Sequence, residues 1–162
     1  MNIGKVMKAM IGYYSGDVQR INHFVKVYGY AKTIGELEGI DEGTQEILEI
    51  AAITHDIGIK VSEEKYHSAS GHYQQIEGPF EAQTLLSKLE VNEAIIDRTC
   101  WLIAHHHTYN DIREIDHQIL VEADFLVNIH ESEMGEDAIR NVKDTIFKTD
   151  AGKYFLENLF MC

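Results

Sequence analysis

Three polar residues lie where the helical spacing of the sequence calls for hydrophobic side chains: His23, His55 and Asp124. Their apolar neighbours one helical turn away are Val27 for His23, Ala51 for His55, and Leu120 and Val127 for Asp124. A buried carboxylate is costly without a positive partner, and no Lys or Arg stands at a nearby helical spacing from Asp124. A divalent cation bound jointly by the three side chains would satisfy all of them. We therefore expect a metal site inside the protein.

Each of these residues also has a purely structural interpretation. A single inward histidine can be a hydrogen-bonded core residue, and an inward aspartate can be a cap or stabilise a turn. The pair His55-Asp56 by itself is expected by chance in a chain of this composition. The metal interpretation depends on the coincidence of His23, His55-Asp56 and Asp124 on apolar helical faces.

The order of these residues resembles the HD-domain superfamily of metal-dependent phosphohydrolases. The similarity lies in His23, in the segment AAITHDIG with His55 and Asp56, and in the segment LVEADFLVNIH with Asp124, and it spans residues 20–130. The resemblance implies that His23, His55, Asp56 and Asp124 bind a divalent metal inside a bundle of helices. The implied cofactor is a transition metal (Fe, Mn, Zn, Co or Ni), with one or two ions bound.

Many members of this superfamily bind a second metal through two additional histidines. The segment WLIAHHHTYN resembles the part of the chain that supplies one of them. Consecutive helical side chains diverge by about 100°, so three adjacent histidines cannot all face one centre. Apolar neighbours one turn earlier favour His105 and His106 as ligands, whereas His107 is expected to face solvent or a substrate. The alternative is a histidine run that interacts with the dipole at a helix C-terminus.

The other additional histidine has no direct counterpart in this chain. In two-metal relatives it often stands four residues before a glycine that opens a helix, and in the segment GHYQQIEGPFEAQ this position is Gln74. His72 and Glu77 are the candidates nearby for a second metal or for the substrate, and each can equally be a loop or capping residue. Relatives often have Lys directly after the sequence HDIG, whereas here Ile59 is followed by Lys60.

The chemistry of such a centre is hydrolytic. A bound divalent ion lowers the pKa of a water ligand and polarises a phosphoryl oxygen, so phosphate esters can be hydrolysed near neutral pH. Asp56 is the expected catalytic residue, because its two carboxylate oxygens can bridge two metals. Arg20 and Lys60 are candidate phosphate ligands, although each is a solvated surface charge by default. The sequence therefore predicts a metal-dependent phosphohydrolase that acts on a nucleotide or another small phosphate ester.

Two other functions fit the same residues. A His/Asp site tolerates iron, so an oxygenase with a paired-iron centre is one alternative. A metal-stabilised ligand-binding or sensory domain without turnover is the other. Oxygen-dependent spectra would favour the oxygenase. Phosphate release from a panel of nucleotides would favour the hydrolase, and tight ligand binding without product would favour the sensory domain.

Composition limits the class of protein further. The chain has 162 residues and a formal net charge of −13, which fits one domain over residues 1–162 and disfavours nucleic-acid polymers and anionic membranes as partners. Two cysteines and no recognisable export signal predict a cytoplasmic location. Apolar runs are too short for a membrane span. The apolar faces of the first and last helices are available for packing or for a homodimer.

Helical periodicity dominates the chain, and strand-like alternation is nearly absent. We expect an all-α, single-domain compact bundle of about six to eight helices, like an HD domain. Helices are predicted over residues 3–14, 18–37, 44–56, 79–89, 92–107, 119–131, 136–147 and 154–160. Residues 59–75 are predicted to form a loop. Asp17 is predicted to cap the second helix, Gly58 to end the third, and Pro79 to lie in the first turn of the fourth.

Overall fold

The computed structural model describes residues 2–162, and within these residues the chain forms nine α-helices and no β-strand. In chain order the helices are α1 (Ile3–Tyr13), α2 (Val18–Glu38), α3 (Glu42–Thr54), α4 (Gly58–Tyr66), α5 (Gly71–Lys88), α6 (Glu93–His105), α7 (Ile115–Glu131), α8 (Glu136–Thr145) and α9 (Asp150–Phe160). The predicted all-α bundle is confirmed. None of the helices in the described residues is both long and apolar enough to cross a membrane.

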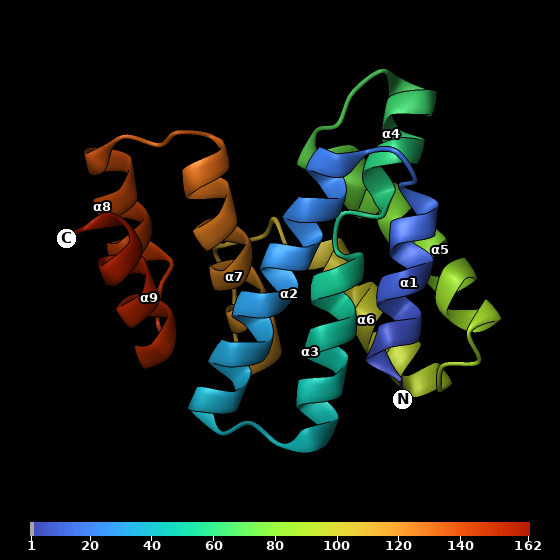
Figure 1. Ribbon diagram of the computed structural model, residues 1–162, viewed down its shortest axis with the longest axis horizontal. Coiled ribbons are helices and arrows are strands. Elements are labelled where there is room, and N and C mark those ends of the chain that lie inside the picture. Colours follow the sequence, from blue (N-terminus) through green and yellow to red (C-terminus); the bar gives the residue numbers. More distant parts are fainter. Residues whose placement is uncertain (1) are drawn as a thin grey trace.

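Helix α3 lies at the centre of the bundle and packs against α1, α2, α6 and α7 (Figure 1). Every residue from Leu48 to Thr54 is buried, as expected for a helix surrounded by others. Its side chains divide between two hydrophobic clusters, one shared mainly with α2, α7, α8 and α9 and the other mainly with α1, α5 and α6. The residues that follow α3 in the chain, His55 and Asp56, are therefore held at a fixed position between neighbouring helices.

The segment predicted as a loop, residues 59–75, is mostly helical. Helix α4 runs to Tyr66, His67 adopts the left-handed conformation with φ 52°, and α5 then begins at Gly71. Pro79 consequently lies inside α5 rather than in a first turn, which corrects the prediction. The polar composition concealed α4 because the residues that this helix buries are small, Gly58 and Ser62.

Gly58 has a different role from the predicted one. Helix α3 ends at Thr54, before Gly58, and Gly58 is the first residue of α4. A Cβ atom at Gly58 would lie 2.8 Å from the backbone oxygen of Gln74 and from the backbone nitrogen of Gly78. The missing side chain thus lets α4 approach α5 closely. The predicted cap at Asp17 is confirmed, since its side chain accepts a hydrogen bond of 3.1 Å from the backbone nitrogen of Arg20.

The C-terminal helices α8 and α9 form a pair at one end of the molecule, and α9 packs on α2 and α7 (Figure 1). The buried carboxylate of Glu122, on α7, holds the connection between them. It accepts hydrogen bonds of 3.2 Å from the backbone nitrogens of Lys148 and Thr149, one of 2.7 Å from Thr149 Oγ1, and one of 2.6 Å from Gln118 Nε2. At the other end, the apolar face of α1 packs within the chain, where Val6 and Met10 are buried.

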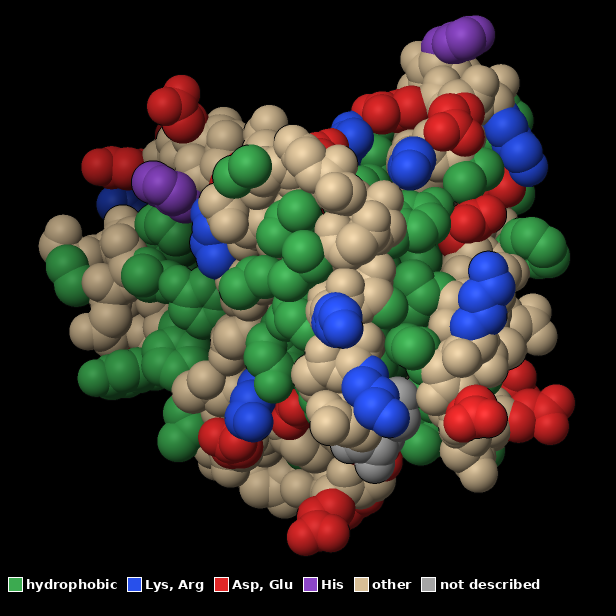
Figure 2. All heavy atoms as spheres, turned by 45° about the vertical axis from the view of Figure 1, so that its right-hand side comes forward, with side chains coloured by type: hydrophobic (Ala, Val, Ile, Leu, Met, Phe, Trp, Pro, Cys, Tyr) green, Lys and Arg blue, Asp and Glu red, His purple; other side chains and the backbone are tan. Residues whose placement is uncertain are grey.

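The surface carries charges of both signs. On the face in Figure 2, basic and acidic side chains are scattered over the surface, and hydrophobic side chains show between them.

Candidate metal centre

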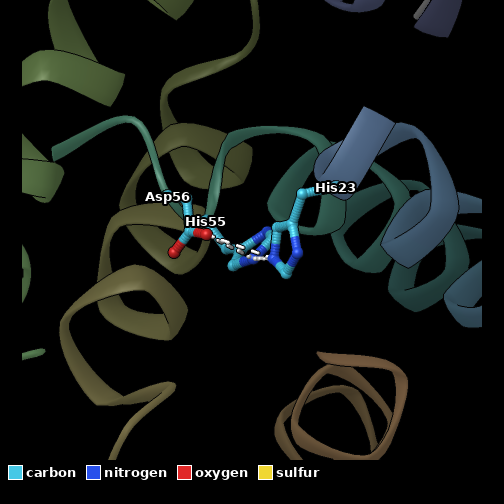
Figure 3. A group of neighbouring side chains, drawn as sticks. All are labelled: His23, His55 and Asp56. Atoms are coloured by element: carbon cyan, nitrogen blue, oxygen red, sulfur yellow. Dashed lines mark hydrogen bonds and ion pairs between the residues drawn. The ribbon is translucent and has the colours of Figure 1, made fainter. Parts of the chain in front are cut away.

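Side chains from three helical segments converge at the middle of the bundle. His23 comes from the first half of α2, His55 and Asp56 directly follow the last residue of α3, and Asp124 comes from α7. His23 Nε2 lies 3.1 Å from Asp124 Oδ1 and 3.2 Å from Asp56 Oδ2, and His55 Nε2 lies 3.4 Å and 3.3 Å from the same oxygens. The two imidazole nitrogens are 3.3 Å apart, and Figure 3 shows both rings turned toward the Asp56 carboxylate. Four ligand-type atoms therefore surround one point.

The outer nitrogen of each inward imidazole is engaged elsewhere. His55 Nδ1 is 2.7 Å from the Ala52 carbonyl oxygen, and His106 Nδ1 is 2.7 Å from that of Ile103. A carbonyl oxygen only accepts, so these Nδ1 atoms carry the proton and donate it. His23 Nδ1 lies 2.8 Å from Glu131 Oε2. Each ring consequently presents Nε2 to the centre, in the manner of metal-binding histidines whose other nitrogen is fixed by an outer hydrogen bond.

Without a bound cation, the pKa values in this cluster favour protonated imidazoles and ionised carboxylates. Burial alone would lower the pKa of His23, but hydrogen bonds to Asp124 and Asp56 outweigh it and raise the pKa to about 10. The pKa of His55 is likewise raised, against burial, chiefly by the charge of Asp56. Burial would raise the pKa of Asp56 and Asp124, yet the adjacent imidazoles hold both pKa values well below the usual range. The centre thus stabilises positive charge between two carboxylates.

His106 supplies one further nitrogen. Its ring is fully buried, and Nε2 lies 3.5 Å from Asp56 Oδ1. Within residues 2–162 this Nε2 atom has no hydrogen-bond partner. A buried imidazole nitrogen without a partner is costly, and a metal ion is the kind of group that removes the cost. The residues present therefore fit a divalent metal.

Comparisons with known proteins agree with this geometry. The sequence model of the HD domain matches residues 20–141. The chain belongs to the HD-domain family. The family has divalent metal-dependent hydrolases as members, so the resemblance predicted from His23, His55-Asp56 and Asp124 is confirmed at the level of the family.

A solved structure shares the fold of this HD domain. The crystal structure of a predicted HD superfamily hydrolase from an uncultured Thermotogales bacterium superimposes with a TM-score of 0.70 at 20% identity, covering 97% of this chain and 84% of that one. At this identity the likeness concerns the fold alone. No curated protein matches the sequence.

The structure brings five of the six predicted metal ligands of this HD domain together, and His105 is the exception. Its Nδ1 lies 2.7 Å from the Trp101 carbonyl oxygen and its ring stacks on Trp101 at 4.0 Å. His107 instead turns inward, with a ligand nitrogen in one group with Asp56 and His106. The expected inward orientation of His105 is thus corrected, whereas His107, expected to face solvent or a substrate, lines the cavity beside the centre.

A cavity of about 390 Å³ opens onto the centre. Its walls include His23, Asp56 and Asp124 from the centre, and around them Tyr14, Arg20, Gln74, His107 and Asn128. Arg20 is the cation on this wall; it pairs with Asp17 at 3.0 Å and also contacts Glu63. Arg20 is one of the two residues that were predicted to bind phosphate.

The remaining predicted site residues lie outside the cavity wall. The Lys60 ammonium lies 5.2 Å from the ring centroid of Tyr13, and His72 is exposed. Glu77 is buried but accepts hydrogen bonds from Lys65 at 3.0 Å and Tyr66 at 2.8 Å. Glu77 thus serves to hold α4 against α5.

Glu131 and Gln74 are the residues whose place in the site the sequence did not reveal. Glu131 contacts His23 through Oε2, and its Oε1 lies 3.2 Å from the Lys26 ammonium. Gln74 Nε2 donates to the Ala69 carbonyl oxygen at 2.6 Å, while its Oε1 faces His107 Nε2 at 3.1 Å. The only signal for Gln74 was its position four residues before Gly78.

Proposed function

We propose that this HD domain is a metal-dependent phosphohydrolase that acts on a small phosphate ester such as a nucleotide. The observation that supports it best is the cluster of His23, His55, Asp56 and Asp124, three of which line a cavity with a guanidinium on its wall. A volume of about 390 Å³ suits a small molecule rather than a polymer. When bound, the metal would supply an activated water and a Lewis acid toward a phosphoryl oxygen.

The chain itself supplies position and charge. Asp56 turns Oδ2 toward His23 and His55 and Oδ1 toward His106, so it is the carboxylate at the middle of the site. Arg20 stands at the cavity with its guanidinium already held by Asp17, which reduces the freedom it must lose to bind a phosphate. Its contact with Glu63 is the interaction that an incoming phosphate would have to compete with.

The test is phosphate release by the full chain loaded with Mn²⁺ or Co²⁺. The substrates would be nucleoside mono-, di- and triphosphates, sugar phosphates and an aryl phosphate. Wild type and His105→Ala are expected to release phosphate from at least one class, and Asp56→Ala to fall to background. His105→Ala is a matched control because His105 neighbours the site in sequence, is bound to the Trp101 carbonyl oxygen and is not among the residues that line the cavity.

Two results would overturn the proposal. Metal-loaded wild type that releases no phosphate from any class is one, and unchanged turnover in Asp56→Ala is the other. Oxygen-dependent product formation by the iron-loaded chain would support an oxygenase instead. Tight ligand binding without product would support a sensory domain.

A further inference from the structure

A second cavity adjoins the one at the metal centre. Its volume is about 550 Å³, compared with about 390 Å³ for the cavity that opens onto His23 and Asp124. Gln19 and Glu131 line both cavities, so the two spaces meet at these side chains. A molecule whose one end is held at the metal centre can therefore extend into the larger cavity.

The walls of this second cavity are part polar and part apolar. Its polar residues Asn22 and Lys26 belong to the first half of α2, which lies at the same end of the bundle as the connection from α7 to α8 (Figure 1). The apolar lining residues come from the end of α7 and from the segments that follow it: Ile129, Met134, Ile139 and Phe160. A largely apolar wall with a few polar groups is typical of sites for small organic molecules.

The turn after α7 holds the apolar part of the cavity in place. The backbone nitrogen of Met134 donates a hydrogen bond of 3.0 Å to the Ile129 carbonyl oxygen, and that of Glu133 donates one of 3.2 Å to the His130 carbonyl oxygen. Glu133 is left-handed, with φ 51°, as is common where a helix ends. Met134 itself packs against the hydrophobic core. This side of the cavity is thus formed by the chain before any ligand is bound.

The neutral amides near the start of α2 are available to a ligand. Gln19 and Asn22 are exposed, and their side chains make no hydrogen bond within residues 2–162. An amide both donates and accepts hydrogen bonds, so it suits the hydroxyl groups, carbonyl oxygens and ring nitrogens of an organic molecule. The junction of the two cavities therefore favours a polar but uncharged group.

The charge on the walls limits how much phosphate a substrate can carry. Among the described residues, Arg20 and Lys26 are the only lysine or arginine side chains that line either cavity. Arg20 is paired with Asp17 at 3.0 Å. Lys26 is paired with Glu131 at 3.2 Å. Additional phosphate groups in the second cavity would lie near Glu131 and Glu133, where like charges repel, so a single phosphoryl group at the metal centre fits best.

We propose that the second cavity binds the alcohol part of the substrate, and that the substrate is a phosphate monoester of a bulky, partly apolar alcohol. Nucleoside monophosphates have this chemistry, since they combine one phosphate with hydroxyl groups and an aromatic base. Hydrolysis breaks the P–O bond to the alcohol; water supplies the oxygen that the phosphate gains and the proton that the alcohol takes up. The inference rests on the proposed function for the bond that is cleaved.

Selectivity between large and small esters tests the proposal. The Mn²⁺-loaded full chain would be assayed with adenosine and thymidine 5′-monophosphate, glycerol 3-phosphate and adenosine 5′-triphosphate. Wild type is expected to favour the nucleoside monophosphates over the other two esters by more than about 10-fold in kcat/KM, because apolar contacts to the alcohol add binding energy.

A substitution that fills the second cavity should reduce this preference. Asn22→Trp places a large side chain in the cavity and should lower the preference for nucleoside monophosphates over glycerol 3-phosphate by at least about 10-fold, chiefly through KM. Val25→Trp is the matched control, because it adds the same side chain at an exposed position of α2 that lines neither cavity. It should keep the preference of wild type.

Binding without turnover is an independent readout. The phosphonate analogue of adenosine 5′-monophosphate, in which a P–C bond replaces the bond that is cleaved, would be titrated into the Mn²⁺-loaded chain in a calorimeter. Asn22→Trp should weaken its binding by at least about 10-fold, and Val25→Trp should not. If Asn22→Trp does not fold by circular dichroism, Met134→Glu takes its place, because it puts a charge into the apolar wall and should weaken binding in the same way.

The outcomes separate this inference from the proposed function. Wild type that cleaves glycerol 3-phosphate or the triphosphate as well as the nucleoside monophosphates overturns the inference and leaves the proposed function standing. Unchanged selectivity in Asn22→Trp overturns it as well. If no ester releases phosphate, the proposed function is rejected and the titration decides. Phosphonate binding that Asn22→Trp weakens then sustains the second cavity as the site of the organic group, whereas no binding, or equal binding in both proteins, overturns it.

Discussion

Helix α7 buries two carboxylates that lie two residues apart and face different regions of the molecule. Glu122 is 0% exposed and Asp124 is 4% exposed. Because residues two apart on a helix point about 200° away from each other, Glu122 meets the C-terminal helices and Asp124 meets the histidine cluster. The same helix therefore builds a structural contact on one side and a metal site on the other.

The difference lies in what each carboxylate faces. Glu122 accepts hydrogen bonds from neutral donors only, namely Gln118, Thr149 and two backbone nitrogens, and burial raises its pKa despite them. Asp124 faces imidazoles that hold its pKa well below the usual range, and it shares them with Asp56. Burial of an acid is thus no mark of a functional site. The acid at the candidate site is instead marked by histidine partners that it shares with a second carboxylate.

The largest predicted effect is on metal binding by Asp124→Asn. Asparagine keeps an oxygen but removes the negative charge of one of the four ligand groups, which should weaken metal affinity by more than about 100-fold, because even outer partners of ligands are worth about 10- to 100-fold. Isothermal titration with Co²⁺ measures it. Glu122→Gln is the paired control and should retain wild-type metal affinity. Equal losses of affinity in the two variants would show that the two faces of α7 do not have separate roles.

The second prediction concerns the structural side of α7 and its effect on stability. In Glu122→Gln, an amide NH₂ group that cannot accept hydrogen bonds faces the surrounding donors. The buried hydrogen bonds lost in this way should lower the free energy of unfolding by about 1–3 kcal/mol. Urea denaturation of the metal-free proteins measures this. Thr149→Val removes one of the same hydrogen bonds together with the cap that Thr149 Oγ1 provides for the Gly152 backbone nitrogen, and it should lower stability in the same direction. A Glu122→Gln protein as stable as wild type would disprove the structural role.

A smaller effect is expected at the outer edge of the metal centre. Glu131→Gln keeps an acceptor for His23 Nδ1 but removes the charge that favours its proton, so metal affinity should fall by about 10-fold. Lys26→Met removes the exposed partner of Glu131 and should leave affinity within about 2-fold, since exposed ion pairs contribute little. Competition with a fluorescent chelator resolves both.

The smallest effect is a pH dependence of the metal-free protein. His23 has a pKa of about 10 in the folded chain against an ordinary 6.5. The stability that this proton provides is complete below pH 6.5 and is lost as the pH rises toward 10. Thermal unfolding in the presence of a chelator should therefore weaken over this range. Asp124→Asn should flatten the slope and Glu122→Gln should keep it; an identical slope in all three would contradict the assignment.

The inner ligands could be predicted from the sequence because they interrupt the apolar faces of regular helices. His23, His55 and Asp124 each lie at positions that periodicity assigns to the core, and the structure buries all three. The burial of Glu122 could not be predicted in this way. It lies two positions from Asp124, on a different face of the helix, where an acid exposed to solvent would also be expected. Its burial depends on α9, which is remote in sequence.

The histidine run could not be resolved in the same way. Helix α6 ends at His105, so the step of about 100° per residue no longer applies to His106 and His107. The orientation of these rings is set by the turn after α6 and by Gln74 on α5. Glu131 was missed for a related reason, because it stands 108 residues from His23 and contacts it only through the packing of α7 on α2.

The hydrogen bonds that fix each imidazole from behind have a kinetic consequence. The rotational entropy of the ligand rings is lost when the chain folds, not when an ion arrives. Binding of a metal ion should therefore require little rearrangement of the chain. We expect fast association, a small heat-capacity change on binding, and selection of the ion by its radius. In this respect the domain would differ from zinc fingers, which are unfolded without their metal.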